Sequence, residues 1–129
     1  MTELVFLKLG GSLITDKTLP YTPRLDKLAD LAAQISAALR THPGLSLVLG
    51  HGSGSFGHTA AKQYKTRQGL APGQAGEDMY WRGFAEVWYQ AAALNRFVVD
   101  GLHSAGVASL ALAPVSAVTA SSGQVSGWD

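Results

Sequence analysis

The chain has 129 residues, 47% of them hydrophobic, with a formal net charge of +1 and no cysteine. This length is enough for one domain with a buried core, and the near-neutral charge argues against a broad surface for nucleic acid. Without cysteine, disulfides, thiolate metal sites and a cysteine nucleophile are excluded, and the composition suits the reducing cytoplasm. The first residues read as mature protein and no apolar run reaches membrane-spanning length, so we expect no membrane partner.

Two short apolar runs, residues 4–9 and 45–49, are each followed by a glycine-rich stretch, and they predict buried parallel strands that end in tight turns. Between the strands, Thr22 and Pro23 are typical of the N-cap and first residue of a helix. Apolar residues then recur at helical spacing until residues 42–44, where a proline and a glycine end the pattern. The predicted order so far is strand, helix, strand.

A second helix is expected to begin near residues 56–59 and to end at about residue 65. Residues 66–76 have no periodicity and contain three glycines and a proline, which predicts a mobile loop. A long helix follows and should end near residues 103–106. Its face with Trp81, Phe84 and Trp88 has two interpretations, which stay open: core, or the wall of a pocket for an apolar substrate.

Residues 107–112 predict a third strand, and the tail predicts a hairpin that turns at Ser122 and Gly123. The alternation of strands and helices indicates an α/β sandwich with a mostly parallel sheet. Ligands in such folds bind at the carboxyl ends of the strands, and both glycine-rich turns are expected to lie there.

The two turns have the composition of an anion site. Gly10, Gly11 and Ser12 follow the first strand, and the stretch "GHGSGSFGH" at residues 50–58 follows the second. Glycines let the backbone pass close to a ligand, and free N–H groups at the start of a helix bind anions. Phosphate is therefore the expected ligand.

Three charged or titratable side chains accompany these turns. Lys8 taken alone fits a lysine that reaches solvent from a strand end, but beside Gly10 and Gly11 its amine would converge with free N–H groups. Lys17 is either a surface charge in a turn or a further cation at the same crevice. His58 follows the glycine stretch and can donate to a phosphate oxygen, whereas His51 is expected to have a structural role.

Other chemistries fit less well. Gly52, Gly54 and Gly57 spell G-x-G-x-x-G, but the acidic residues at the right distance, Glu77 and Asp78, open a helix instead of ending a strand. We therefore rank a dinucleotide-dependent oxidoreductase low. No metal-ligand spacing and no serine nucleophile elbow is present, so we expect no protein-ligated metal.

With K-x-G-G-S at residues 8–12, T-D-K at 15–17 and H-G-x-G-S-F-G-H at 51–58, the chain resembles the amino acid kinase superfamily, and within it the family of isopentenyl phosphate kinases. The resemblance spans essentially all of the sequence. One departure is Ser53, where the family pattern has glycine or alanine. The resemblance implies a three-layer α/β sandwich and transfer of the ATP γ-phosphate onto isopentenyl phosphate, which gives isopentenyl diphosphate for isoprenoid biosynthesis.

The resemblance also implies residue roles. Lys8 would bridge the phosphates of donor and acceptor, Lys17 would stabilise the transferring phosphoryl group, and His58 would bind the acceptor phosphate. Mg²⁺ would arrive with ATP, and the aromatic helix face would shape an isoprenoid pocket. The implied ATP-phosphate contacts are Lys8, Gly10, Gly11, Ser12 and Gly54, and the implied substrate contacts are Gly52, Ser53, Gly54, Gly57 and His58.

Family members are longer than this chain, and the resemblance implies that their second half carries the nucleotide pocket. Residues 1–129 are therefore expected to be the acceptor-binding part and not to turn over efficiently alone. Two alternatives stay open, a related kinase for another small phosphate, phosphonate or carboxylate acceptor, and a non-catalytic phosphate-binding module. A homodimer is expected by family analogy only.

Overall fold

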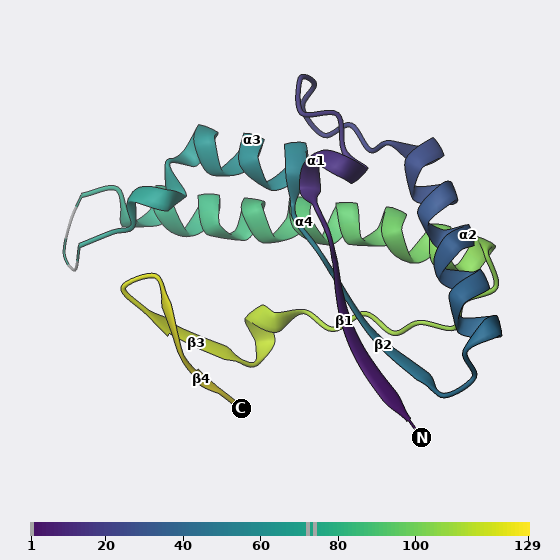
Figure 1. The fold of residues 1–129 in the computed structure, drawn as a ribbon. Helices are drawn as coiled ribbons and strands as arrows, with labels where there is room; N and C mark the ends of the chain where they lie inside the picture. The colour runs from purple at the N-terminus through teal and green to yellow at the C-terminus, as the bar shows by residue number, and fades with distance from the viewer. Residues whose placement is uncertain (1, 72, 74) are drawn as a thin grey trace.

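The computed structural model describes residues 2–71, 73 and 75–129 (Figure 1). In chain order the elements are β1 (Glu3–Leu9), α1 (Gly11–Ile14), α2 (Leu25–Thr41), β2 (Leu45–His51), α3 (Gly54–Tyr64), the 3₁₀ helix η1 (Thr66–Gln68), α4 (Glu77–Ser104), the 3₁₀ helix η2 (Pro114–Ser116), β3 (Val118–Ser121) and β4 (Gln124–Trp128). None of the described helices is both long enough and apolar enough to cross a bilayer.

The two predicted strands pair in parallel, in a register that runs from Glu3 opposite Leu45 to Leu9 opposite His51. Their carboxyl ends therefore lie at the same edge of the sheet, and α1 and α3 both start there (Figure 1). The prediction that both glycine-rich turns share one edge is confirmed.

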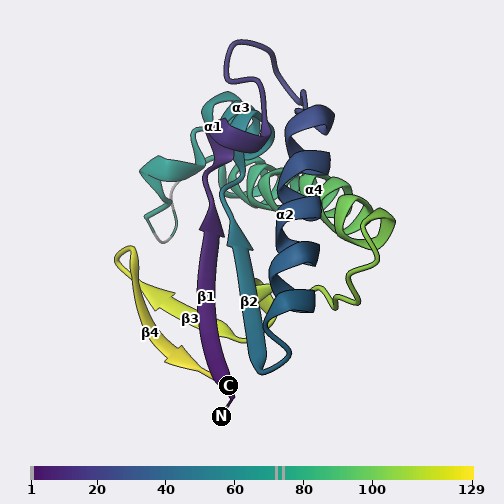
Figure 2. The ribbon, with the colours of Figure 1, turned by 45° about the vertical axis from the view of Figure 1, so that its right-hand side comes forward.

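One face of this sheet is covered by helices. In Figure 2, α2 runs alongside β2, and α4 passes behind α2. Leu47 and Leu49 of β2 pack against a buried cluster contributed by β1, α1, α2, α3 and α4. The members of the cluster are Leu9, Ile14, Leu28, Ala32, Ile35, Phe56, Leu94, Val98 and Leu102. Each of these four helices thus buries part of its apolar surface in the common cluster.

The opposite face of the sheet is open. Leu4, Phe6 and Val48 lie on it, and Phe6 is 75% exposed. The α/β class is confirmed, and the described residues supply two of the three predicted layers, one of helices and one of sheet. Parallel sheets are ordinarily covered on both faces, so this apolar face is an unusual surface.

The first long helix begins later than predicted. Helix α2 starts at Leu25, with Arg24 as its N-cap, so the predicted cap at Thr22 and Pro23 is wrong. The N–H of Thr22 is 3.3 Å from the Oγ of Ser55, to which it donates. A tertiary contact thus occupies the residue that the local pattern assigns to the helix.

Helix α3 begins earlier than predicted, at Gly54 and not at residues 56–59. The N–H groups of Phe56 and Gly57 both donate to the carbonyl of Ser53, at 3.1 and 3.2 Å, and close the first turn. The glycine-rich stretch is therefore itself the start of the helix.

The predicted strand at residues 107–112 is not formed. No strand pairs with it among the described residues, and Leu110 is 95% exposed. A strand requires a hydrogen-bonded neighbour, and no described strand lies beside these residues. The hairpin prediction is confirmed, because β3 and β4 are antiparallel and both turn residues, Ser122 and Gly123, have positive φ.

The predicted loop at residues 66–76 contains η1 and is otherwise irregular over its described residues. Its mobility stays a prediction, and residues 72 and 74 lie outside the described part of the chain.

Candidate active site

The two glycine turns touch each other through their backbones. The N–H of Gly52 donates to the carbonyl of Leu9 at 2.9 Å. A Cβ atom at Gly11 would lie 2.5 Å from the backbone nitrogen of Gly54, and one at Gly52 would lie 2.8 Å from the nitrogen of Gly11. Such approaches exclude any side chain, so glycine is required on both sides of the contact.

Four backbone N–H groups at this contact have no acceptor among the residues that the structure describes. They belong to Gly11 and Ser12 at the start of α1 and to Ser53 and Gly54 at the start of α3. The first N–H groups of a helix lack intrahelical partners, and their partial positive charge favours an anion. Two such ends in contact form a cradle suited to phosphate oxygens.

Thr15 ties the two turns together and is 1% exposed. Its hydroxyl donates to the carbonyl of Gly11 at 2.7 Å and accepts from the N–H of Ser55 at 3.0 Å. Gly54 has φ of +49°, and a Cβ there would collide with the Thr15 side chain. Thr15 belongs to the T-D-K motif, but its contact with Ser55 has no local sequence signal because the two residues are forty positions apart.

The loop that carries Lys17 is fixed to α3 at its far end. The ring of Tyr21 packs edge-on against Phe56, with centroids 6.0 Å apart. The Phe56 ring in turn lies 6.2 Å from that of Phe97 in α4. The loop projects beyond α1 (Figure 1), and Lys17 itself is exposed.

The three predicted cationic or donating side chains are all exposed. Lys8 lies at the end of β1, opposite Gly50 in the register, and Lys17 and His58 lie in the loop after α1 and in α3. Among the described residues, no hydrogen bond or ion pair joins any of the three to the glycine turns. The three come from the segments that meet at the same sheet edge, and their roles stay predictions.

Asp16 precedes Lys17 and has a perturbed carboxyl group. The hydroxyl and N–H of Thr18 donate to its Oδ1, at 2.6 and 2.8 Å. These bonds stabilise the carboxylate and hold the pKa of Asp16 below its ordinary value, with a smaller contribution from the charge of Arg24.

His51 is half-buried at the end of β2 and has two polar neighbours. Its Nδ1 lies 3.0 Å from the carbonyl oxygen of Gly52, and its Nε2 lies 3.0 Å from Nδ2 of Asn95 in α4. A structural role for His51 agrees with this geometry. Asn95 lies 44 residues away from His51 in the sequence, and no local sequence signal connects it with the glycine turn.

The aromatic face of α4 is not core in this chain. Trp81, Phe84 and Trp88 are each about half exposed, and the rings of Trp81 and Phe84 stack edge to face at 5.7 Å. The buried side of α4 instead carries Gly83, Leu94, Val98 and Leu102. The core interpretation is therefore wrong, and the pocket interpretation stays a prediction.

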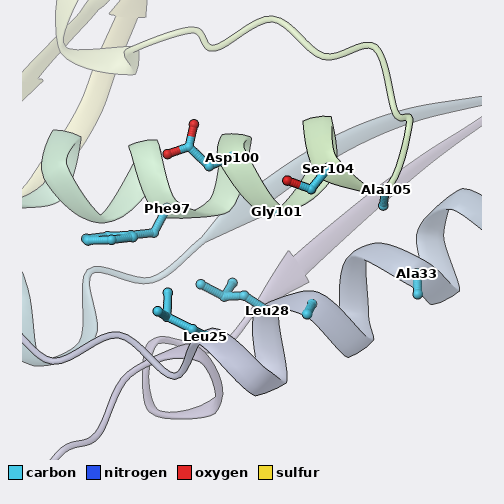
Figure 3. Close-up of a pocket in the computed structure, with 9 residues that line it drawn as sticks. Leu25, Leu28, Ala33, Phe97, Asp100, Gly101, Ser104 and Ala105 are labelled. Carbon is cyan, nitrogen blue, oxygen red and sulfur yellow. The ribbon is translucent and has the colours of Figure 1, made fainter.

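Two grooves lie along α4, away from the glycine turns. One has a volume of 440 Å³ and includes Trp88 and Tyr64. The other, of 410 Å³, lies between α2 and α4, and Figure 3 shows Phe97, Leu25 and Leu28 along it. Neither includes a residue of the cradle, which is a backbone surface. No group of three or more His, Asp or Glu side chains in the described part of the chain is arranged to hold a metal ion.

Comparison of the sequence with known protein families identifies the family of this chain. The sequence model of the amino acid kinase family matches residues 3–127. The chain therefore belongs to the amino acid kinase family.

Within the amino acid kinase family, the chain is similar in sequence to isopentenyl phosphate kinases. The chain is 33% identical over 119 residues to the isopentenyl phosphate kinase of Methanocaldococcus jannaschii, covering 89% of this chain and 45% of that protein. It is 34% identical over 128 residues to the isopentenyl phosphate kinase of Methanothermobacter thermautotrophicus, covering 98% and 46%. The chain thus spans about half the length of these relatives.

The chain is also similar in fold to solved structures of isopentenyl phosphate kinases. An X-ray structure of isopentenyl phosphate kinase superposes with a TM-score of 0.84 at 31% identity, covering 98% of this chain and 50% of that one. An isopentenyl phosphate kinase substrate complex superposes with a TM-score of 0.69 at 27% identity, covering 97% and 47%.

Proposed function

We propose that the protein containing this chain transfers the γ-phosphate of ATP to isopentenyl phosphate and forms isopentenyl diphosphate. The observation that carries the proposal is the cradle where the two glycine turns touch, with four N–H groups that have no acceptor among the described residues. It is supported by about one-third identity to two isopentenyl phosphate kinases.

The chemistry needs positive charge more than a base. A phosphate monoester has a second pKa near 6, so the acceptor is already largely a dianion at neutral pH and needs no proton removed. The obstacle is repulsion between two anionic phosphates that must approach in line. Backbone donors and cations fixed around them lower this barrier.

In this proposal the cradle would hold phosphate oxygens of donor and acceptor, and Lys8 would bridge the two. Lys17 would stabilise the phosphoryl group in transfer, and His58 would donate to the acceptor phosphate. Mg²⁺ would be held through the phosphates of ATP, as is usual for this ion. Trp81, Phe84 and Trp88 offer an apolar wall for the isoprenoid tail.

Residues 1–129 would supply the acceptor side of the reaction. The relatives extend over about twice the matched length, and the nucleotide pocket is expected in the part that this chain does not match. We therefore expect the 129-residue chain alone to bind phosphate without efficient turnover. The cytoplasm and a homodimeric assembly are the expected setting.

Phosphorus NMR of the complete polypeptide with ATP, Mg²⁺ and isopentenyl phosphate tests the proposal. We expect a new diphosphate signal that falls at least tenfold in rate in the His58→Ala variant, in line with the loss of one charge-stabilising donor. His103→Ala is the matched control, because His103 is an exposed histidine in the last turn of α4. This variant should retain the unmodified rate.

The alternatives give different spectra. A related kinase would leave isopentenyl phosphate intact and phosphorylate a competing phosphate, phosphonate or carboxylate acceptor. A non-catalytic module would broaden the phosphate resonance without consuming ATP. Either result would overturn isopentenyl phosphate as the acceptor, and equal rates in the two histidine variants would remove His58 from the site.

A further inference from the structure

The imidazole of His51 connects helix α4 with the second glycine turn. Asn95 of α4 lies on one side of the ring and the carbonyl of Gly52 on the other, each at 3.0 Å. The ring is half-buried at the carboxyl end of β2, directly before the cradle. We refer to His51 and Asn95 together as the His51–Asn95 pair.

These contacts define the tautomer of the neutral ring, that is, which of its two nitrogens carries the proton. A carbonyl oxygen can only accept, so the Nδ1 of His51 must carry the proton that it donates to Gly52. In the neutral ring Nε2 is then an acceptor, and the amide nitrogen of Asn95 is the donor that it faces. Free imidazole has no such constraint, so the partner on one nitrogen selects the tautomer at the other.

The carbonyl of Gly52 shares a peptide plane with the N–H of Ser53, which belongs to the cradle. The trans peptide bond places the Gly52 C=O and the Ser53 N–H in one plane, pointing in opposite directions. Holding the carbonyl toward His51 therefore fixes the Ser53 N–H away from His51. That N–H is one of the four without an acceptor among the described residues.

We propose that the His51–Asn95 pair positions the phosphate-binding N–H of Ser53, with Asn95 selecting the Nδ1–H tautomer of His51 and His51 orienting the Gly52–Ser53 peptide. Both are positioning residues, since neither is expected to touch the substrate. The proposal rests on the proposed function only for the identity of the anion that the cradle holds.

The packing of α4 does not need this hydrogen bond. Leu94, the neighbour of Asn95, is fully buried, and it belongs to the same core cluster as Phe56 of α3. Gly83 packs closely on Tyr64 farther along the same pair of helices. The polar pair is therefore additional to an apolar contact that already joins α3 to α4, which makes a role in orientation testable apart from stability.

The test variant is Asn95→Leu, which keeps side-chain size and removes the donor. Gln90→Leu is the matched control, because Gln90 lies on α4 and its amide donates at 2.8 Å to Glu86 of the same helix, away from the turn. If leucine at position 95 prevents folding, Asn95→Ala replaces it. Nitrogen NMR of the histidine rings in the complete polypeptide distinguishes a protonated from an unprotonated ring nitrogen.

We expect the unmodified protein and Gln90→Leu to show His51 protonated at Nδ1, and Asn95→Leu to populate the Nε2–H form. Inorganic phosphate should shift the Ser53 amide resonance in the first two proteins and much less in Asn95→Leu. The kcat/KM for isopentenyl phosphate should fall about 10- to 100-fold in Asn95→Leu alone, as when supporting hydrogen bonds are removed from other functional sites.

Two results would overturn the proposal, an Nε2–H tautomer in the unmodified protein, or a phosphate response and kcat/KM in Asn95→Leu equal to those of Gln90→Leu. Failure of the proposed function has a separate signature. If the unmodified protein forms no isopentenyl diphosphate, that function is wrong, and the ring tautomer with the Ser53 response to inorganic phosphate still decides the role of the pair.

Discussion

The glycine turns and the segment after α4 differ in how their residues find partners. At the turns, Thr15 and Ser55 are buried and bond to each other across forty residues of sequence. Val107 still packs against the core cluster, whereas the hydrogen bonds beyond it are local, such as those of the β3–β4 hairpin and the bond from the N–H of Asp129 to the carbonyl of Ala117. The leucines at residues 110 and 112 are almost completely exposed.

The difference shows that the described residues determine the geometry of the cradle but not the partner of the apolar segment after α4. The turns are held by backbone contacts that tolerate no added atom, so the cradle is defined within the chain itself. In the later segment, Leu110 and Leu112 are apolar side chains without a partner among the described residues. Substitutions that add atoms at the contact between the turns should therefore have large effects on stability.

Gly11→Ala should have the largest effect. The new Cβ would lie 2.5 and 2.7 Å from the nitrogen and Cα of Gly54, which are backbone atoms that cannot rotate away. Because overpacking of rigid atoms is costly, we expect the free energy of unfolding to fall by about 3 kcal/mol. Urea unfolding followed by circular dichroism measures this change.

Gly10→Ala is the control for that prediction. The nearest atom to its new Cβ would be the Cβ of Leu13 at 4.0 Å, and Gly10 has φ of −62°, which alanine adopts freely. Its free energy of unfolding should stay within about 0.5 kcal/mol of the unmodified value. Equal losses in the two variants would contradict the backbone contact between the turns.

Thr15→Val should have the second largest effect. Valine fills similar space but leaves the N–H of Ser55 and the carbonyl of Gly11 without the hydroxyl between them. An unsatisfied buried group costs about 1–3 kcal/mol, so we expect a loss of about 2 kcal/mol in thermal unfolding. Thr15→Ser retains the hydroxyl and should lose less, and the reverse order would show that the methyl group matters more than the bonds.

Much of the fold follows from local patterns in the sequence. The runs at residues 4–9 and 45–49 are apolar except for one residue each, a glycine-rich stretch follows each, and both form strands. The hairpin at Ser122 and Gly123 follows from residues that tolerate positive φ. These features depend on a few neighbouring residues, so the sequence alone predicts them.

Features that depend on distant partners have no reliable local signal in the sequence. Thr22 is a residue type that is typical of a helix N-cap, but its N–H donates a hydrogen bond to the hydroxyl of Ser55, 33 residues away. The aromatic side chains at residues 81, 84 and 88 have the spacing of a buried face, but no described element covers them. Burial is a property of the assembled structure, and periodicity indicates it only where a neighbour is present.

The candidate site divides in the same way. The motifs locate Gly11, Gly52 and Gly54, and the structure supplies a reason for each in the contact between the turns. The partnership of His51 with Asn95 joins residues 44 positions apart and has no local signature. Spacing thus identifies a cradle, whereas only the fold shows which side chains orient it.

Thr18→Ala should have the smallest effect, because it changes an exposed turn beside Lys17. Removing the hydroxyl removes the first cause of the lowered pKa of Asp16, so that pKa should rise toward its ordinary value. A lowered pKa in the folded state stabilises the fold above the pKa of the unfolded chain, and this contribution is lost as the pH falls through the folded value.

Carbon NMR titration of the Asp16 carboxyl measures the rise in its pKa. Thr41→Ala is the control, because the hydroxyl of Thr41 bonds to backbone carbonyls. An unchanged midpoint in Thr18→Ala would show that the hydroxyl of Thr18 does not stabilise the carboxylate, and that backbone N–H groups and the charge of Arg24 account for the lowered pKa.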